Sequence, residues 1–353
     1  MRTHLGMAAA VVLEVSGCVP SPSPVVQDAT FLVPLTQART FIPGHEVLPR
    51  VLLDRGHALT VTDEPDALYD ALGTAGVRLD PCFTEGKAGE CQPQLRLVLQ
   101  PIFDEAGVPT SRDAAVHLFF RGTRAEVLTA VQAIGLARVE RGLDVDSLPT
   151  YPHPGFADST FRTRVKSALR PFLSADRLVR VTVMGVHASH EAWMFSGLDL
   201  TSGSPVDLPI PTLAPAHEQH VTSTGKLQSL EVTLAPAPAA EPALVPVIAA
   251  GGIAGSSPDA LAAASEAVRR LEDPTQHNPG TVDCASCHVA ALARFQLQRA
   301  GSYTPSGAEL APVYEDTRNL RAFGFYFTDP AVSPRLLIES RVVLDLLHGE
   351  LGR

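Results

Sequence analysis

Two cysteines and a histidine in the C-terminal third of the chain have types and spacing that point to cofactor chemistry. Cys284, Cys287 and His288 form the pattern Cys-x-x-Cys-His. On a helix, residues three and four positions apart share one face, so both thiols and the imidazole point the same way. Thiols placed like this form thioethers with the vinyl groups of a haem, and the imidazole binds the iron. The sequence therefore predicts covalently attached haem c, with His288 as the proximal iron ligand.

A chance occurrence of the pattern is one alternative, and two other uses of the cysteine pair are further alternatives. A redox dithiol of the Cys-x-x-Cys type is typical of a βαβ context, whereas the segment around Cys284 has a helical pattern. A zinc site would need about two further Cys or His ligands at suitable spacing, and His277 is the nearby candidate. Asp283 and Thr281 stand where a helix that begins at Cys284 would be capped.

Through this motif, the C-terminal third of the chain resembles the c-type cytochromes. More loosely, the stretches at residues 282–284 and 319–321 are similar to uncharacterised haem-motif lipoproteins of myxobacterial type. The first resemblance implies a mono-haem electron carrier with a mainly α-helical haem domain. The second implies no known reaction.

The second axial ligand of the iron is not fixed by the motif. No Met follows His288, and His348 is the only later His, which makes it a candidate distal ligand. The alternative for His348 is a surface role near a helix C-terminus, where its charge suits the helix dipole. His277, Met184 and Met194 are further candidates, and an open five-coordinate iron is another alternative.

The segment that follows the motif contains the densest aromatic cluster of the chain and two arginines. The aromatic residues either wall a haem pocket or belong to an ordinary core: they are Phe323, Phe325, Tyr326 and Phe327. Arg318 and Arg321 either pair with haem propionates or lie on the solvated surface.

The N-terminus has the pattern of an export signal. Arg2 precedes an apolar run at residues 5–13, which is too short to cross a bilayer. Small residues before Cys18 resemble the lipobox of bacterial lipoproteins, which implies cleavage before Cys18 and lipidation of its thiol. We expect a signal peptide at 1–17, a Pro/Ser-rich tether at 18–30, and a lipid-anchored protein of the bacterial cell envelope that faces the periplasm or the outer membrane.

Cys82 and Cys91 are the remaining cysteines of the five. Export places the folded chain in a compartment where disulfides persist. We therefore expect a disulfide between them, which would close a loop of about ten residues and contribute roughly 3 kcal/mol in the chain-entropy model. A second redox centre is the alternative.

Residues 31–234 mix strand and helix patterns and are expected to form an α+β domain of unknown function. Leu95, Leu97 and Leu99 alternate with other residues as in a strand with one buried face. Thr123 with Glu126 predicts a capped helix. Residues 235–256 are rich in Pro and Gly and are expected to be a linker. Residues 257–353 carry helical patterns and are expected to form the haem-binding, cytochrome c-like domain.

The formal net charge is −10, so the basic surface that nucleic-acid binding requires is missing. The leading hypothesis is an exported mono-haem lipoprotein that carries electrons to a redox partner with a basic or neutral docking face. The alternatives are a haem peroxidase or small-gas sensor with an open sixth iron position, hence a haem-dependent oxidoreductase, and a surface binding lipoprotein in which haem is accessory.

Overall fold

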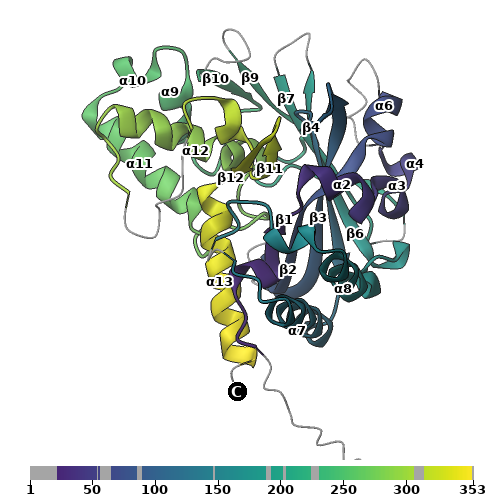
Figure 1. Ribbon diagram of the computed structural model, residues 1–353. Coiled ribbons are helices and arrows are strands. Elements are labelled where there is room, and N and C mark those ends of the chain that lie inside the picture. The colour runs from purple at the N-terminus through teal and green to yellow at the C-terminus, as the bar shows by residue number, and fades with distance from the viewer. Residues whose placement is uncertain are drawn as a thin grey trace, which may run out of the picture.

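The structure is a computed structural model that describes residues 22–351, apart from 54, 56–64, 86–89, 146–147, 188–191, 202–203, 224–229 and 306–313. The described part is a mixture of one large sheet and helices, which confirms the α+β expectation (Figure 1). Among the described residues, no helix is both long and apolar enough to cross a membrane. The signal segment and Cys18 lie outside the described residues.

Ten strands within the described part form one antiparallel sheet, in the order β1-β2-β3-β5-β6-β7-β9-β10, with β4 beside β3 and β8 beside β7. A separate hairpin pairs β11 with β12. The strands are β1 (Thr30–Leu32), β2 (Leu72–Glu85), β3 (Glu90–Glu105), β4 (Val108–Ser111), β5 (Ala115–Arg121), β6 (Leu178–His187), β7 (Ala192–Asp199), β8 (Val206–Asp207), β9 (Gln219–Ser223), β10 (Val232–Ala235), β11 (Phe323–Tyr326) and β12 (Asp329–Val332).

The helices gather in groups on different sides of this sheet. Figure 1 shows α9 to α12 together at the left, α7 and α8 at the lower right, and α13 running downward between them. The helices are α1 (Val26–Ala29), α2 (Leu35–Phe41), α3 (Gly44–Val47), α4 (Arg50–Leu53), α6 (Pro65–Asp70), α7 (Arg124–Glu140), α8 (Ser159–Leu169), α9 (Val245–Ile248), α10 (Gly252–Gly255), α11 (Pro258–Glu272), α12 (Cys284–Arg299) and α13 (Pro334–Leu351).

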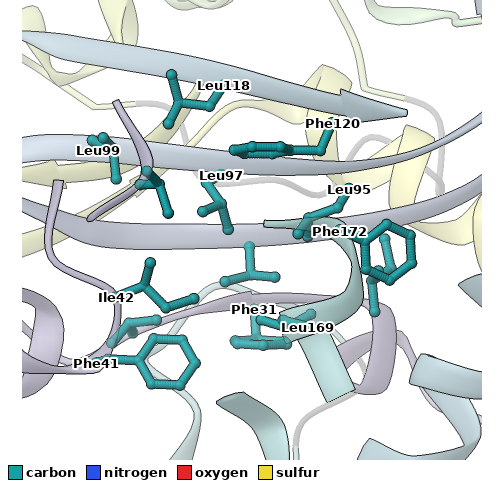
Figure 2. Close-up of a cluster of buried hydrophobic side chains, with 14 of the residues drawn as sticks. Phe31, Phe41, Ile42, Leu95, Leu97, Leu99, Leu118, Phe120, Leu169 and Phe172 are labelled. Atoms are coloured by element: carbon teal, nitrogen blue, oxygen red, sulfur yellow. The ribbon is translucent and has the colours of Figure 1, made fainter. Parts of the chain in front are cut away.

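One face of the sheet builds the largest hydrophobic core. Leu95, Leu97 and Leu99 of β3 point toward this core, together with Leu118 and Phe120 of β5 (Figure 2). The apolar stripes of α7 and α8 cover them, and α7 begins at the predicted capping box, in which Thr123 and Glu126 bond each other's backbone. Burial of these side chains supplies the main driving force for the sheet.

The opposite face of the sheet is also covered, which differs from the expectation of strands with a single buried face. Val98 and Ala115 on this face pack with the β11–β12 hairpin and with α13. Gln100 of β3 pins the hairpin, because its amide donates to the Phe325 carbonyl and accepts from the Phe325 N–H, at 3.0 and 2.7 Å. The second face therefore lies inside the protein.

Helices α11 and α12 share a core with the far end of the sheet. Trp193 and Phe195 of β7 pack in the same hydrophobic cluster as Leu271 of α11 and Leu297 of α12. The segment expected to be a linker takes part as well, since its residues Leu244, Val247 and Ile248 are fully buried in this cluster.

The second half of the expected tether is folded too. Residues 26–29 form α1 and are buried, and the Asp28 carboxylate pairs with Arg138 of α7 at 2.8 Å. The chain is therefore anchored to the main core four residues before β1.

Candidate functional site

Helix α12 begins at the first residue of the Cys-x-x-Cys-His pattern. Asp283 is its N-cap, and its carboxylate accepts a hydrogen bond from the Ser286 N–H at 2.9 Å. This cap fixes the first turn, so Cys284, Cys287 and His288 lie on one face. All three side chains line a single cavity of about 190 Å³ between α12, α13 and the second face of the sheet.

The His288 ring is held in one orientation. Its Nδ1 lies 2.7 Å from the carbonyl oxygen of Leu320, and its ring packs on Phe195 with 4.7 Å between centroids. A carbonyl only accepts, so Nδ1 carries the proton and Nε2 keeps the lone pair that a metal needs. Burial lowers the pKa of His288, although the Leu320 carbonyl opposes this, and the imidazole is neutral near pH 7.

The Leu320 carbonyl comes from the second stretch that sequence resemblance singled out. Leu320 ends the 3-10 turn η5 (Thr317–Leu320). The Asn319 side chain braces this turn, because it accepts from the Tyr314 N–H and donates to the carbonyls of Tyr314 and Asp316. The turn and the motif helix thus meet at His288.

The two motif cysteines are not bonded to each other. Burial, with Cys287 and Asp283 nearby, raises the pKa of Cys284 to about 12, and burial also raises the pKa of Cys287. Reactive dithiols and zinc ligands need thiolates, which this environment disfavours. Among the described residues, no group of three or more His, Cys, Asp or Glu side chains is arranged to hold a metal ion.

A buried glutamine ties the start of α12 to the sheet. Gln219 of β9 is fully buried; its amide donates to the Asp283 carboxylate at 2.7 Å and accepts from the Ala285 N–H at 2.8 Å. Because Asp283 is also the N-cap, Gln219 sets both the position and the direction of the motif helix.

The far wall of the cavity is the second face of the sheet. Consecutive strands contribute alternate residues to it, as the period of two in a strand requires. The wall residues of these strands include Arg78 (β2), Arg96, Val98 and Gln100 (β3), Ala115, His117 and Phe119 (β5), Arg180, Thr182 and Met184 (β6) and Phe195 (β7).

His117 is the imidazole of this wall. Burial lowers its pKa to about 3, with further contributions from Arg96 and His288. His117 is therefore neutral near pH 7, and it lies close enough to His288 for the charge of one ring to act on the other. No sequence motif marked this residue.

The cavity lining is rich in positive charge although the whole chain is acidic. Five arginines line it, against the carboxylates of Asp283 and Glu339. Arg96 lies over the rings of both Phe83 and Phe119, with its guanidinium carbon 5.0 and 4.6 Å from their centroids. Its Nε and Nη2 are buried, and no described residue bonds to them. Such unpaired donors are costly, so the site is suited to an anionic group.

A buried charge network joins α13 to the sheet beside the cavity. Glu339 pairs with Arg78 of β2 and, at 2.7 Å, with Arg335 one helical turn away. Arg78 also meets Asp80 at 2.7 Å. Burial favours the neutral acid of Glu339, but Arg78, Arg335 and Arg96 outweigh it and lower its pKa to about 2.

Arg335 links this network to the segment before the motif. It donates to the carbonyls of Leu271 and His277. The network therefore fixes α13, the end of α11 and the wall of the cavity relative to one another.

The structure places the candidate distal ligands at different sites. His348 does not line the cavity, since its Nε2 lies 3.0 Å from the Pro24 carbonyl at the other end of α13. His277 also lies outside the lining, with its Nε2 2.9 Å from Glu241. Met184 lines the cavity, whereas Met194 packs against the large core.

Some residues of the aromatic cluster line the cavity and others do not, and the same is true of the two arginines. Phe323 lines the cavity, Phe325 is buried against the sheet, and Phe327 is exposed. Arg321 lines the cavity and pairs with Asp113, whereas Arg318 lies outside the lining and pairs with Asp316 and Asp329.

Cys82 and Cys91 form a disulfide near the end of the β2–β3 pair. Phe83, which follows Cys82, is one of the two rings that hold Arg96. The crosslink thus supports one edge of the cavity wall.

Comparisons with protein families, curated proteins and solved structures found no match. The assignment of this site therefore depends on its own geometry.

Proposed function

We propose that this protein is an exported, lipid-anchored, mono-haem c-type cytochrome-like protein that carries single electrons. The observation that carries the proposal is the shared face of Cys284, Cys287 and His288 on the cavity. There, the Leu320 carbonyl holds the imidazole with Nε2 available to a metal. The haem would lie between α12 and the sheet, with the helical C-terminal third as its cytochrome c-like part.

The two thiols suit haem attachment by addition. Each S–H would add across one vinyl double bond: sulfur bonds to one carbon, the thiol hydrogen ends on the other, and no oxidant is consumed. Cys284 and Cys287 are not bonded to each other, as this addition requires, and they lie one helical turn apart on the cavity side.

The chemistry of the rest of the lining suits an apolar group that carries a carboxylate. Val98, Ala115, Phe195 and Phe323 give apolar surface and exclude water. Arg96 provides two buried N–H donors for a propionate, in the charge-assisted pairing that guanidinium forms with carboxylate. When bound, the haem iron supplies one-electron chemistry.

The expected export supports the same proposal. Haem c is attached outside the cytoplasm, in the compartment to which a lipoprotein signal directs the chain. Lipidation at Cys18 would hold the protein at a membrane of the cell envelope. Because the chain carries a formal charge of −10, its redox partner would dock through a basic or neutral face.

Electron carriage is tested on the full chain, expressed with a haem-attachment system and purified from membranes. We expect a spectrum that changes reversibly over a one-electron redox titration, and slow reaction with hydrogen peroxide. Rapid, repeated peroxide turnover would favour the haem peroxidase alternative and would contradict the carrier.

The anchor is tested separately. We expect Cys18→Ser to move the protein from the membrane fraction to the soluble fraction without changing its redox spectrum. Membrane attachment that persists in this variant would contradict a lipid anchor.

A further inference from the structure

The sheet wall of the cavity carries an imidazole that faces the motif from the other side. His117 lies in the middle of β5, opposite Val98 of β3 and Thr182 of β6. It lines the same cavity as Cys284 and His288. Two histidines from distant parts of the chain, 171 positions apart in sequence, thus line one cavity.

His117 differs in its bonding from three other buried or half-buried histidines. His153, His277 and His288 each have a hydrogen-bond partner. Among the described residues, no donor or acceptor reaches the ring nitrogens of His117. Its ring contacts that of Phe119, with 6.5 Å between centroids. The ring of His117 is therefore available to a ligand in the cavity that the residue lines.

The other cavity residue with a soft donor atom is Met184. Its thioether lies in an apolar cluster with Trp193 and Phe195, where a methionine is stable without any bond. His117 has no hydrogen-bond partner among the described residues, so of the two it is the residue whose ring nitrogen is available to a ligand.

We infer that His117 is the second axial ligand of the haem iron. The inference rests on the proposed function, since it requires a haem held by Cys284, Cys287 and His288. It means that the sheet closes the sixth position, so the iron has two imidazole ligands and is low-spin. A closed position suits electron transfer and excludes peroxide or carbon monoxide as an easy ligand.

The test uses the full-length holoprotein and three variants: His117→Ala, Met184→Leu and His348→Ala. We expect a low-spin wild type that does not bind carbon monoxide when reduced. His117→Ala should keep the same covalent haem content, become high-spin and bind one carbon monoxide per haem. Added free imidazole should restore its low-spin spectrum, a rescue that a general loss of structure would not give. Met184→Leu and His348→Ala should remain low-spin.

Near-infrared magnetic circular dichroism of the ferric wild type identifies the axial pair without any substitution, so the inference stays testable if His117→Ala does not fold. Two imidazoles are expected. A high-spin wild type, an imidazole–thioether pair, or a His117→Ala variant that stays low-spin would each overturn the inference and leave the haem itself in place. Absence of covalent haem from the wild type would instead overturn the proposed function.

Discussion

Glu339→Gln isolates the buried charge network that joins α13 to the sheet. The substitution keeps the shape of the side chain and removes its charge. Arg78 and Arg335 then lose their shared carboxylate while their side chains remain at most 9% exposed. Removing one partner of a buried ion pair costs about 3–5 kcal/mol. Because Asp80 still pairs with Arg78, we expect the free energy of unfolding to fall by an amount near the lower end of this range, about 3 kcal/mol at pH 7.

The pKa of Glu339 gives the direction of the pH dependence. It falls to about 2 in the folded protein, against about 4.3 for an unperturbed Glu, because Arg78, Arg335 and Arg96 outweigh the effect of burial. A lowered folded pKa means that this stability is present above about pH 4.3 and is lost as the pH falls toward 2. The wild type should therefore lose its advantage over Glu339→Gln between these two pH values.

The assay is urea unfolding of the holoprotein followed by far-UV circular dichroism at pH 7 and pH 3. Glu140→Gln is the matched control, since Glu140 pairs with Arg164 on the surface, where both side chains are more than 40% exposed. Such a pair is worth at most about 1 kcal/mol. Equal losses in Glu339→Gln and Glu140→Gln, or the same loss for Glu339→Gln at both pH values, would refute this account of the network.

Two further substitutions test how the cavity walls are held. Gln219→Glu replaces a donor to Asp283 with a second buried carboxylate. We expect it to lower the free energy of unfolding by about 1–3 kcal/mol, measured by thermal unfolding, and to reduce the haem attached per protein, measured by haem absorbance. Unchanged haem attachment would argue against a positioning role for Gln219. Gly76→Ala places a Cβ 2.7 Å from the Phe323 ring, so we expect the free energy of unfolding to fall by about 1–3 kcal/mol, measured by thermal unfolding. In Gly255→Ala the new Cβ meets nothing within 4 Å, so its unfolding midpoint should match the wild type.

The parts of the fold that depend on neighbouring residues could be predicted from the sequence. The Thr123–Glu126 capping box starts α7, and Asp283 caps the motif helix, because each bond joins residues three positions apart. The alternation of leucines in β3 predicted both the strand and the face of it that is buried in the core, for the same reason. Local patterns carry this information directly.

The far wall of the cavity could not be predicted in the same way. Arg96 and His117 occupy the alternate positions of strands whose other face is apolar, a pattern that usually indicates a solvent-facing side. Whether that side meets water or a second layer depends on how α12 and α13 pack. The Arg78–Glu339 pair, 261 positions apart in sequence, shows how distant the deciding contacts are.

The expectation for His348 shows the same limit. It is the only histidine after the motif, which made it one candidate distal ligand beside a surface role near a helix C-terminus. In the structure, His348 lies away from the cavity, beside the Pro24 carbonyl. The imidazole that lines the cavity with His288 is that of His117 in β5, which stands 171 residues earlier in the sequence. Order along the chain is a poor guide when a sheet forms one wall of the site.

Covalent attachment of a haem to Cys284 and Cys287 is tested most directly by the intact mass of the protein. The full chain would be produced in a host with a haem-attachment system and denatured in acidified organic solvent, and its mass would be measured by mass spectrometry. We predict a mass increase of one haem that survives this treatment, and its loss in a Cys284→Ser, Cys287→Ser double variant. A folded wild type that carries no bound haem after the same treatment would contradict the account.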